Sequence, residues 1–426
     1  MPTFKLSTLG CKVNQYESQL IREQLLSAGL TESNAKSSAE VYIINTCTVT
    51  QKADSESLNL IRRAIRENAG AQIFVAGCLT ELDAGRIKKL KTGIKIIKNK
   101  HKGNIARHIL GRNKKYASLP GISYFKGRNR AFLKIQDGCN NRCSYCKVPL
   151  VRGLSRSRPV DDIIAEAKRI TARGIKEIVL CGICLGAYGR DLKPAVHLVE
   201  LLCGLEKIKG MERIRLSSIE AGDISDNLID KIRHSSKICR HLHIPIQSGD
   251  DAILKKMGRN YSSNDYLTLI NKIKRKVRGI AVTTDVLVGF PGEGKNNFYN
   301  TLSLVKRISP LKVHIFPYSA REGTAAADFK HAISRQEING RTAQLKKLAA
   351  ECSLEYKKRF LGKKLSVLIE GRHAKDGHFW DGYTDNYIRV LLKSRRNLAN
   401  RIIPVIINEI MPEYALAEPC AGKRFP

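Results

Sequence analysis

Strand-like and helix-like segments alternate along most of this chain, and this alternation limits the possible fold more than any other feature of the sequence. Apolar runs at 4–9, 41–44 and 73–76 are separated by amphipathic segments at 17–30 and 54–67. Such a series builds a parallel sheet, because each helix carries the chain back to the starting edge of the sheet. We therefore predict an N-terminal, Rossmann-like parallel α/β domain.

A second alternating series predicts the central domain. Its strand-like runs are 132–135, 177–180, 213–217, 242–246, 281–288 and 313–316. Helix-like segments lie between them near 161–171, 197–205, 225–232, 263–273 and 295–305. Eight β/α units close a barrel, so six predict a partial (βα)6 barrel that is open at one side. A long helix is expected from about 335 to 360.

Beyond Gly362 the pattern changes to short β-like runs at 365–369, 387–392 and 402–407, which predict a small antiparallel β-barrel. At roughly 100–200 residues per domain, a chain of 426 residues suggests about three domains. They are expected at 1–115, 125–358 and 361–426. The sequence shows no long apolar run and no secretory signal, so we expect a cytoplasmic protein without a membrane segment.

The charge of the chain points to a polyanionic partner. Lys and Arg number 75 against 39 Asp and Glu, which gives a net charge of +36. No acidic residue lies between Asp83 and Asp137, whereas cations are frequent there. Like charges this dense repel one another unless counter-charges lie against them, and RNA is the partner we expect. An organism whose proteins are generally rich in Lys is the alternative.

The C-terminal part combines cations with aromatic side chains. The cations, which we expect to bind phosphates, are Lys363, Lys364, Arg372, Arg389, Lys393, Arg395, Arg396 and Arg401. The aromatic residues are Phe379, Trp380, Tyr383 and Tyr387. Rings of this kind either stack an RNA base or fill the core of a small barrel, and both interpretations stay open for Trp380.

Three cysteines directly follow the strands of the first series, namely Cys11, Cys47 and Cys78. The carboxyl ends of parallel strands lie along one edge of a sheet, where such folds place their ligands. We therefore expect the three thiols to converge on one site. Three separately buried thiols are the alternative, since free cysteine is among the most buried residue types.

Cys139, Cys143 and Cys146 form a C-x3-C-x2-C motif after the first strand of the second series. Three thiolates on one tight loop can hold three irons of a 4Fe-4S cluster and leave the fourth iron open to another ligand. A structural zinc site normally has a fourth Cys or His, and the sequence offers none at zinc-like spacing. The motif therefore favours an iron–sulfur cluster over zinc.

This motif resembles that of the radical S-adenosylmethionine (SAM) enzymes, which carry it after the first strand of a partial barrel, with an aromatic residue before the last cysteine. Tyr145 occupies that position. The resemblance implies that SAM binds the open iron and is cleaved to a 5′-deoxyadenosyl radical. Tyr145, Ser218, Glu220 and Gln247 are expected to contact SAM, and for the last three ordinary hydrogen bonds at strand ends are the alternative.

The whole chain is similar to the methylthiotransferase family. The similar segments are TLGCKVNQYES at 8–18, RLSSIE at 215–220, HIPIQSG at 243–249, VGFPGE at 288–293 and PYSAREGT at 317–324. The resemblance implies an auxiliary 4Fe-4S cluster on Cys11, Cys47 and Cys78, a SAM-cleaving cluster on Cys139, Cys143 and Cys146, and a C-terminal RNA-binding TRAM barrel. It assigns the chemistry to the two clusters and SAM rather than to a catalytic side chain.

Segment 8–18 is most similar to the branch that methylthiolates C2 of N6-threonylcarbamoyladenosine in tRNA. The resemblance therefore implies the anticodon loop of tRNA as partner, and an electron donor such as flavodoxin or ferredoxin. Branches that act on isopentenyladenosine in tRNA or on a ribosomal-protein aspartate are the alternatives, and a non-catalytic, metal-containing RNA-binding protein is an alternative of another class.

Cys181 and Cys184 depart from the family pattern, in which Thr and Asn usually stand. We expect a neutral substitution, although Cys184 puts a cofactor contact at that position in doubt.

Overall fold

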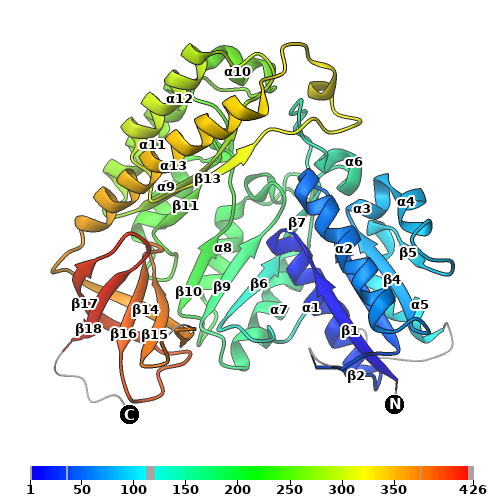
Figure 1. The fold of residues 1–426 in the computed structure, drawn as a ribbon. Helices are drawn as coiled ribbons and strands as arrows, with labels where there is room; N and C mark the ends of the chain where they lie inside the picture. Colours follow the sequence, from blue (N-terminus) through cyan, green and yellow to red (C-terminus); the bar gives the residue numbers. More distant parts are fainter. Residues whose placement is uncertain (1, 35–36, 112–119, 375, 421–426) are drawn as a thin grey trace.

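The computed structural model describes the chain except residues 1, 35–36, 112–119, 375 and 421–426, and it shows three folded parts (Figure 1). The first is a parallel sheet with the order β2-β1-β3-β4-β5. Its strands are β1 (Thr3–Thr8), β2 (Thr31–Glu32), β3 (Val41–Thr46), β4 (Gln72–Gly77) and β5 (Lys95–Ile97). The parallel α/β start of the chain is confirmed.

Two helices cover opposite faces of this sheet. Alternate residues of β3 point to opposite sides, so Ile43 packs with Leu25 of α1 (Lys12–Ser27) and Ile44 packs with Ile61 of α2 (Gln51–Glu67). The shorter helices of this part are α3 (Leu79–Leu82), α4 (Ala84–Lys88) and α5 (Ile105–Leu110).

The second part contains six parallel strands. They are β6 (Arg130–Lys134), β9 (Glu177–Cys181), β10 (Arg213–Leu216), β11 (His241–His243), β12 (Ala281–Val288) and β13 (Lys312–Pro317). The sheets β10-β9-β6 and β11-β12-β13 are joined by isolated bridges from Ile214 to Ile238 and from Ser218 to His243. Within the described residues β6 and β13 do not pair, so the predicted partial barrel with one open side is confirmed.

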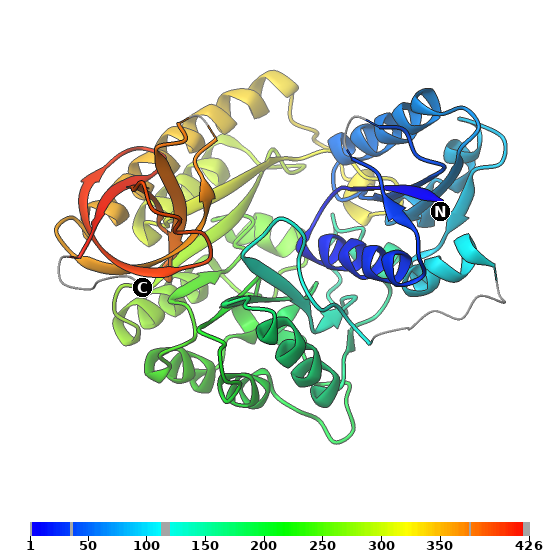
Figure 2. The same cartoon turned by 90° about the horizontal axis from the view of Figure 1, so that it is seen from below.

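Helices surround these strands (Figure 2). The longer ones are α7 (Val160–Ala172), α8 (Leu198–Glu206), α9 (Asp226–His234), α11 (Ser263–Lys276), α12 (Lys295–Ile308) and α13 (Arg335–Lys358). Short elements are β7 (Gln136–Asp137), α6 (Val148–Arg152), β8 (Arg156–Ser157) and α10 (Asp251–Lys256). On β12, Val282 and Val286 pack with the helices, so Thr283 and Asp285 face the interior of the barrel.

The third part is a closed barrel with the order β14-β15-β16-β18-β17. Its strands are β14 (Lys364–Arg372), β15 (Phe379–Thr384), β16 (Arg389–Lys393), β17 (Ile402–Ile410) and β18 (Ala415–Pro419). The small barrel is confirmed, but the expectation that it is antiparallel throughout is wrong, because β16 and β18 pair in parallel. A ring with an odd number of strands cannot alternate in direction all the way round, so it must contain a parallel pair.

Two arginines of β10 anchor this barrel to the second part. Arg213 and Arg215 donate hydrogen bonds to the backbone carbonyls of Ser366, Tyr383, Thr384 and Asp385. Tyr383 and Tyr387 stack on each other with ring centroids 5.2 Å apart, and the Arg215 guanidinium lies 4.7 Å from the Tyr387 ring. These two tyrosines therefore serve the junction between the two parts.

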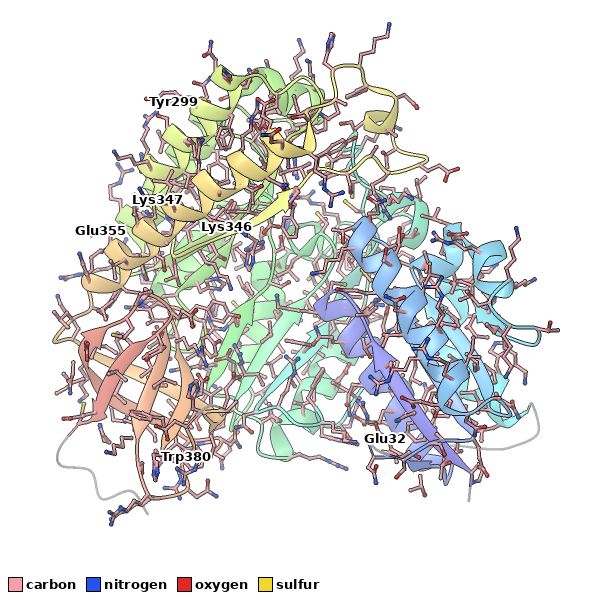
Figure 3. All side chains as sticks on the ribbon, in the orientation of Figure 1. Glu32, Tyr299, Lys346, Lys347, Glu355 and Trp380 are labelled. Carbon is pink, nitrogen blue, oxygen red and sulfur yellow. The ribbon has the colours of Figure 1, made fainter. Side chains whose placement is uncertain are left out.

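Trp380 belongs to the core of the C-terminal barrel (Figure 3). Its side chain is buried, its Nε1 donates to the Ser394 carbonyl at 3.1 Å, and Arg372 covers the ring at 4.1 Å. Of the two interpretations left open for Trp380, the structure supports core packing rather than base stacking.

The basic stretch between Asp83 and Asp137 finds part of its counter-charge inside the protein. Its ion pairs with acids of the protein include Lys98–Glu81, Lys102–Glu17, Lys134–Glu17, Lys126–Glu32 and Arg130–Glu370. Arg112, Lys114 and Lys115 lie outside the described residues. For the paired cations, RNA is not the source of counter-charge, because folding brings acids to them from other segments. No described helix is long and apolar enough to cross a membrane.

Candidate active site

Cys11, Cys47 and Cys78 lie at one edge of the N-terminal sheet. Cys47 and Cys78 directly follow the carboxyl ends of β3 and β4, and Cys11 lies three positions beyond the end of β1. Cys11 and Cys78 are close enough to contribute to the raised pKa of Cys47, and Cys11 to that of Cys78. Gly10 makes this approach possible: its φ is +96°, and a Cβ at this position would lie 2.8 Å from Cys47 Sγ. The structure thus brings the three thiols to one place.

The surroundings of these thiols suit sulfur ligands of a metal cluster. Burial raises the pKa of Cys47 to about 11 and also raises the pKa of Cys78, while the Arg152 guanidinium acts in the opposite direction on both. Asn99 Nδ2 lies 4.0 Å from Cys78 Sγ. A buried thiol loses its proton when it binds a metal. Nearby cations and hydrogen-bond donors then compensate the negative charge of the thiolate.

Cys139, Cys143 and Cys146 lie on the loop between β7 and α6. Two backbone amides point at sulfur, because Asn141 N lies 3.4 Å from Cys139 Sγ and Val148 N lies 3.5 Å from Cys146 Sγ. Hydrogen bonds to sulfur tune iron–sulfur clusters. This donor set therefore fits a cluster held by three thiolates.

Cys184 places a further thiol beside this loop. A hydrogen bond with Cys184 lowers the pKa of Cys139 to about 7, and Cys184 Sγ lies 3.5 Å from Asp223 Oδ2. Cys181, buried at the end of β9, has Cys11 and Lys12 as neighbours instead. The thiols of this C-x2-C pair therefore face different surroundings.

Tyr145 and Glu220 meet at an arginine that sequence reasoning missed. Arg259 donates to the Glu220 carboxylate and, at 2.6 Å, to the Tyr145 hydroxyl. Ser218 and Gln247 stand at the ends of barrel strands, where their backbones form isolated bridges to the next strand. The four residues expected to contact SAM thus lie at the carboxyl ends of the barrel strands or on the cysteine loop.

Arg152 connects the two sets of cysteines. Its buried guanidinium donates to Asn14 at 2.5 Å and to Asp137 at 2.9 Å. Asn14 follows Cys11 by three positions, and Asp137 precedes Cys139 by two. One side chain therefore holds both cysteine loops.

Two further contacts hold the other N-terminal loops. Arg321, which follows β13, donates to the backbone carbonyl of Thr48 at 2.8 Å and to Asp54 at 2.7 Å. Asn99 donates to the Val151 carbonyl of α6 at 2.7 Å. Sequence reasoning missed Arg152 and Arg321 as it missed Arg259, because nothing local distinguishes these arginines among 75 Lys and Arg residues.

Comparison with known proteins agrees with this arrangement. Residues 133–305 match the radical SAM superfamily, and residues 3–98 match the uncharacterized protein family UPF0004. The chain is 37% identical to the threonylcarbamoyladenosine tRNA methylthiotransferase MtaB of Bacillus subtilis, over 96% of this chain and 94% of that protein. It is 39% identical to the MtaB of Chlamydia pneumoniae, over 98% of each chain. It is 34% identical to a tRNA-2-methylthio-N(6)-dimethylallyladenosine synthase of Clostridium tetani, over 96% of this chain and 94% of that protein.

Solved structures share the fold. The radical SAM methyltransferase TsrM from Kitasatospora setae superposes with a TM-score of 0.55 at 14% identity, over 76% of this chain and 77% of that chain. The cobalamin-dependent radical enzyme OxsB gives 0.52 at 14% identity, over 82% of this chain and 56% of that chain. SAM and a 4Fe-4S cluster are the cofactors of this superfamily. Together with the near-full-length relatives, these findings show that the chain belongs to the radical SAM methylthiotransferase family.

Proposed function

We propose that this protein methylthiolates C2 of N6-threonylcarbamoyladenosine next to the anticodon in tRNA. The observation that carries the proposal is the pair of three-cysteine sets held together by Arg152, in a chain that matches the MtaB enzymes over nearly its whole length. An enzyme for isopentenyladenosine in tRNA or for a ribosomal-protein aspartate is the alternative within the family. RNA binding without catalysis would not require two three-cysteine sets beside each other, so the arrangement disfavours a non-catalytic RNA-binding protein.

The six cysteines would hold the cofactors. Cys139, Cys143 and Cys146 would bind the cluster to which SAM coordinates, and Cys11, Cys47 and Cys78 would bind an auxiliary 4Fe-4S cluster. When bound, these groups supply the radical that removes hydrogen from C2 and the methylthio sulfur that replaces it. Tyr145, Ser218, Glu220 and Gln247 would contact SAM, and Arg152 and Arg321 fix the relative position of the two cysteine sets.

The small C-terminal barrel and the charge of the chain bear on the partners of the protein and on where it acts. We propose that the C-terminal barrel is a TRAM domain that binds tRNA beside the anticodon loop, and that the enzyme works in the cytoplasm with an electron donor such as flavodoxin or ferredoxin. The net charge of +36 supports a nucleic-acid partner.

Cysteine variants test the assignment of the two sets. We expect Cys143→Ala to abolish release of 5′-deoxyadenosine from SAM, whereas Cys47→Ala retains SAM cleavage and forms no methylthio product. Cys203→Ala, which changes a thiol of α8 outside both sets, is the control and should behave like the unchanged protein. The measurement is mass spectrometry of both products after anaerobic turnover. Equal SAM cleavage by Cys143→Ala and the unchanged protein would refute the assignment.

The substrate is tested by mass spectrometry of tRNA nucleosides from the source organism after deletion of this gene. We expect the 2-methylthio form of N6-threonylcarbamoyladenosine to disappear and its precursor to accumulate. If that nucleoside persists and another methylthio nucleoside is lost, the substrate is the other adenosine.

A further inference from the structure

Three metal-ligating side chains meet in the interior of the central barrel, outside both sets of cysteines. His243 on β11, Asp285 on β12 and His314 on β13 have ligand atoms that all lie within 4.8 Å of one another. The strands are neighbours in one sheet, and Asp285 is the register partner of His314. The three side chains therefore converge because adjacent parallel strands present them on the same face.

The ring of His243 is held in a fixed orientation. Its Nε2 lies 3.1 Å from Asp285 Oδ1, and its Nδ1 lies 2.9 Å from Thr283 Oγ1. The same hydroxyl lies 3.0 Å from Nε2 of His241, so it can accept from one ring and donate to the other. Metal-ligating histidines usually have their second ring nitrogen fixed in this way, and the hydroxyl of Thr283 serves that purpose here.

His314 is suited to the same task. Its ring centroid lies 5.5 Å from that of His243, and one of its ring nitrogens lies within 4.8 Å of the ligand atoms of His243 and Asp285. The His243 and Asp285 side chains are 16% and 22% exposed, which leaves room for a hydrated ion to reach them. Three protein ligands leave other coordination positions for water or a substrate oxygen.

The neighbouring surface suits a purine. Phe316 lies two residues beyond His314 on β13, so it points to the same face, and it is 39% exposed. A base can stack on such a ring. A metal ion at His314 would then lie close to the substituents on the edge of a base that stacks on Phe316.

We propose that His243, Asp285 and His314 bind a divalent cation, and that the carboxylate of the substrate's threonylcarbamoyl group fills an open coordination position on it. The second half rests on the proposed function, because this carboxylate distinguishes N6-threonylcarbamoyladenosine from unmodified adenosine. No bond is made or broken in this step: an oxygen of the substrate replaces a water molecule on the ion.

Binding of Mn²⁺ tests the site itself. The probe is Mn²⁺ added without RNA to cluster-loaded, oxidised enzyme, and free Mn²⁺ is counted by its electron paramagnetic resonance signal. Mn²⁺ prefers nitrogen and oxygen ligands to thiolates, so it reports on this site rather than on free cysteines. We expect the unchanged protein to bind it stoichiometrically, and Asp285→Asn and His314→Gln each to weaken binding by at least about tenfold.

His234→Gln, which removes an exposed imidazole from α9, is the matched control and should bind Mn²⁺ like the unchanged protein. The metal site is overturned if the unchanged protein binds no stoichiometric Mn²⁺, or if both site variants bind it with unchanged affinity.

Substrate coordination is tested with two anticodon stem-loop RNAs, one with N6-threonylcarbamoyladenosine and one with adenosine. We expect the first to reduce water-proton relaxation by enzyme-bound Mn²⁺, because its carboxylate displaces water, and the second to leave it unchanged. Equal effects of both RNAs overturn carboxylate binding. A failure of the proposed function can be told apart from a failure of the metal site. The first would appear in the tRNA nucleoside analysis and would leave Mn²⁺ binding in the absence of RNA unchanged.

Discussion

Glu17 pairs with three cations, of which Lys102 and Arg152 are buried. Its carboxylate lies 2.6 Å from Lys102, 2.8 Å from Lys134 and 3.2 Å from Arg152. Burial by itself raises the pKa of Glu17, but these cations together hold it well below its usual value. The folded protein therefore requires the ionised carboxylate where the N-terminal sheet meets the barrel.

Glu17→Gln should lower the free energy of unfolding by about 3–5 kcal/mol, because it leaves buried cations without their partner. The folded pKa lies below the unfolded one, so the stabilisation is complete above the usual glutamate range and is lost progressively as the pH falls from there through the folded pKa. The difference between variant and unchanged protein should thus stay constant from pH 7 to about pH 5, as measured by urea denaturation.

The control is Glu355→Gln on the exposed side of α13, where the carboxylate pairs with exposed Lys358 and a change of less than about 0.5 kcal/mol is expected. Figure 3 shows Glu355 at the surface. If Glu17→Gln and Glu355→Gln changed the free energy of unfolding equally, the buried ion pairs of Glu17 would not stabilise the protein more than an exposed pair does.

The cysteines could be located from the sequence, and the arginines around them could not. The spacing of Cys139, Cys143 and Cys146 is local, and the position of Cys11 after a strand is local too. The partners of Arg321 include Asp54, which is 267 positions away, and only the folded chain shows that they meet. His314 is a similar case, since its neighbours come from other strands.

At the level of elements, the segments after β1, β3 and β5 are positioned by contacts from the barrel. Arg321→Ala should loosen the loop of Cys47 while leaving the SAM-binding loop in place. We expect SAM cleavage to continue and methylthio product to fall by about ten- to a hundredfold, because misplacement by an ångström can cost on the order of a hundredfold in rate. The ratio of 5′-deoxyadenosine to methylthio nucleoside measures this uncoupling.

Arg62→Ala removes an exposed cation from α2 of the same N-terminal part and should leave the ratio unchanged. If both products of Arg321→Ala fell in parallel, the arginine would act on the whole fold rather than on the position of one loop.

Elements with a strong local pattern were predicted within a few residues, as β12 shows with the same bounds in sequence and structure. β15 and β18 gave no such signal, since FWDGYT contains a turn-like Asp-Gly pair and ALAEP is short and ends in proline. The start of α1 lies at Lys12 rather than at 17, because Val13 and Tyr16 pack with the core of the barrel. That contact between domains is absent from the local pattern.

At the level of the whole molecule, the net charge of +36 predicts how tRNA binding depends on salt. Each phosphate contact releases counterions, so a protein with several contacts should lose about a thousandfold or more in affinity between about 50 and 200 mM salt. Fluorescence anisotropy with labelled tRNA measures this. Affinity that does not change with salt would contradict phosphate-dominated binding.

A pair of double variants locates the surface that binds tRNA. Arg395→Gln with Arg396→Gln removes two exposed cations from the C-terminal barrel and should make the salt dependence shallower. Lys346→Gln with Lys347→Gln removes two exposed cations from α13 and should change it less (Figure 3). If the α13 double variant instead had the shallower salt dependence, the RNA-binding surface would lie on α13.

The strand order of the C-terminal barrel sets the order in which the protein can be assembled during translation. β18 lies between β16 and β17, so the ring stays open until β18 has emerged from the ribosome. The six cysteines come much earlier in the chain, and domains generally fold as they are synthesised. The parts that would hold the cofactors are therefore complete while the C-terminal barrel is still unfinished, and the nascent protein can mature its metal centres before that barrel exists.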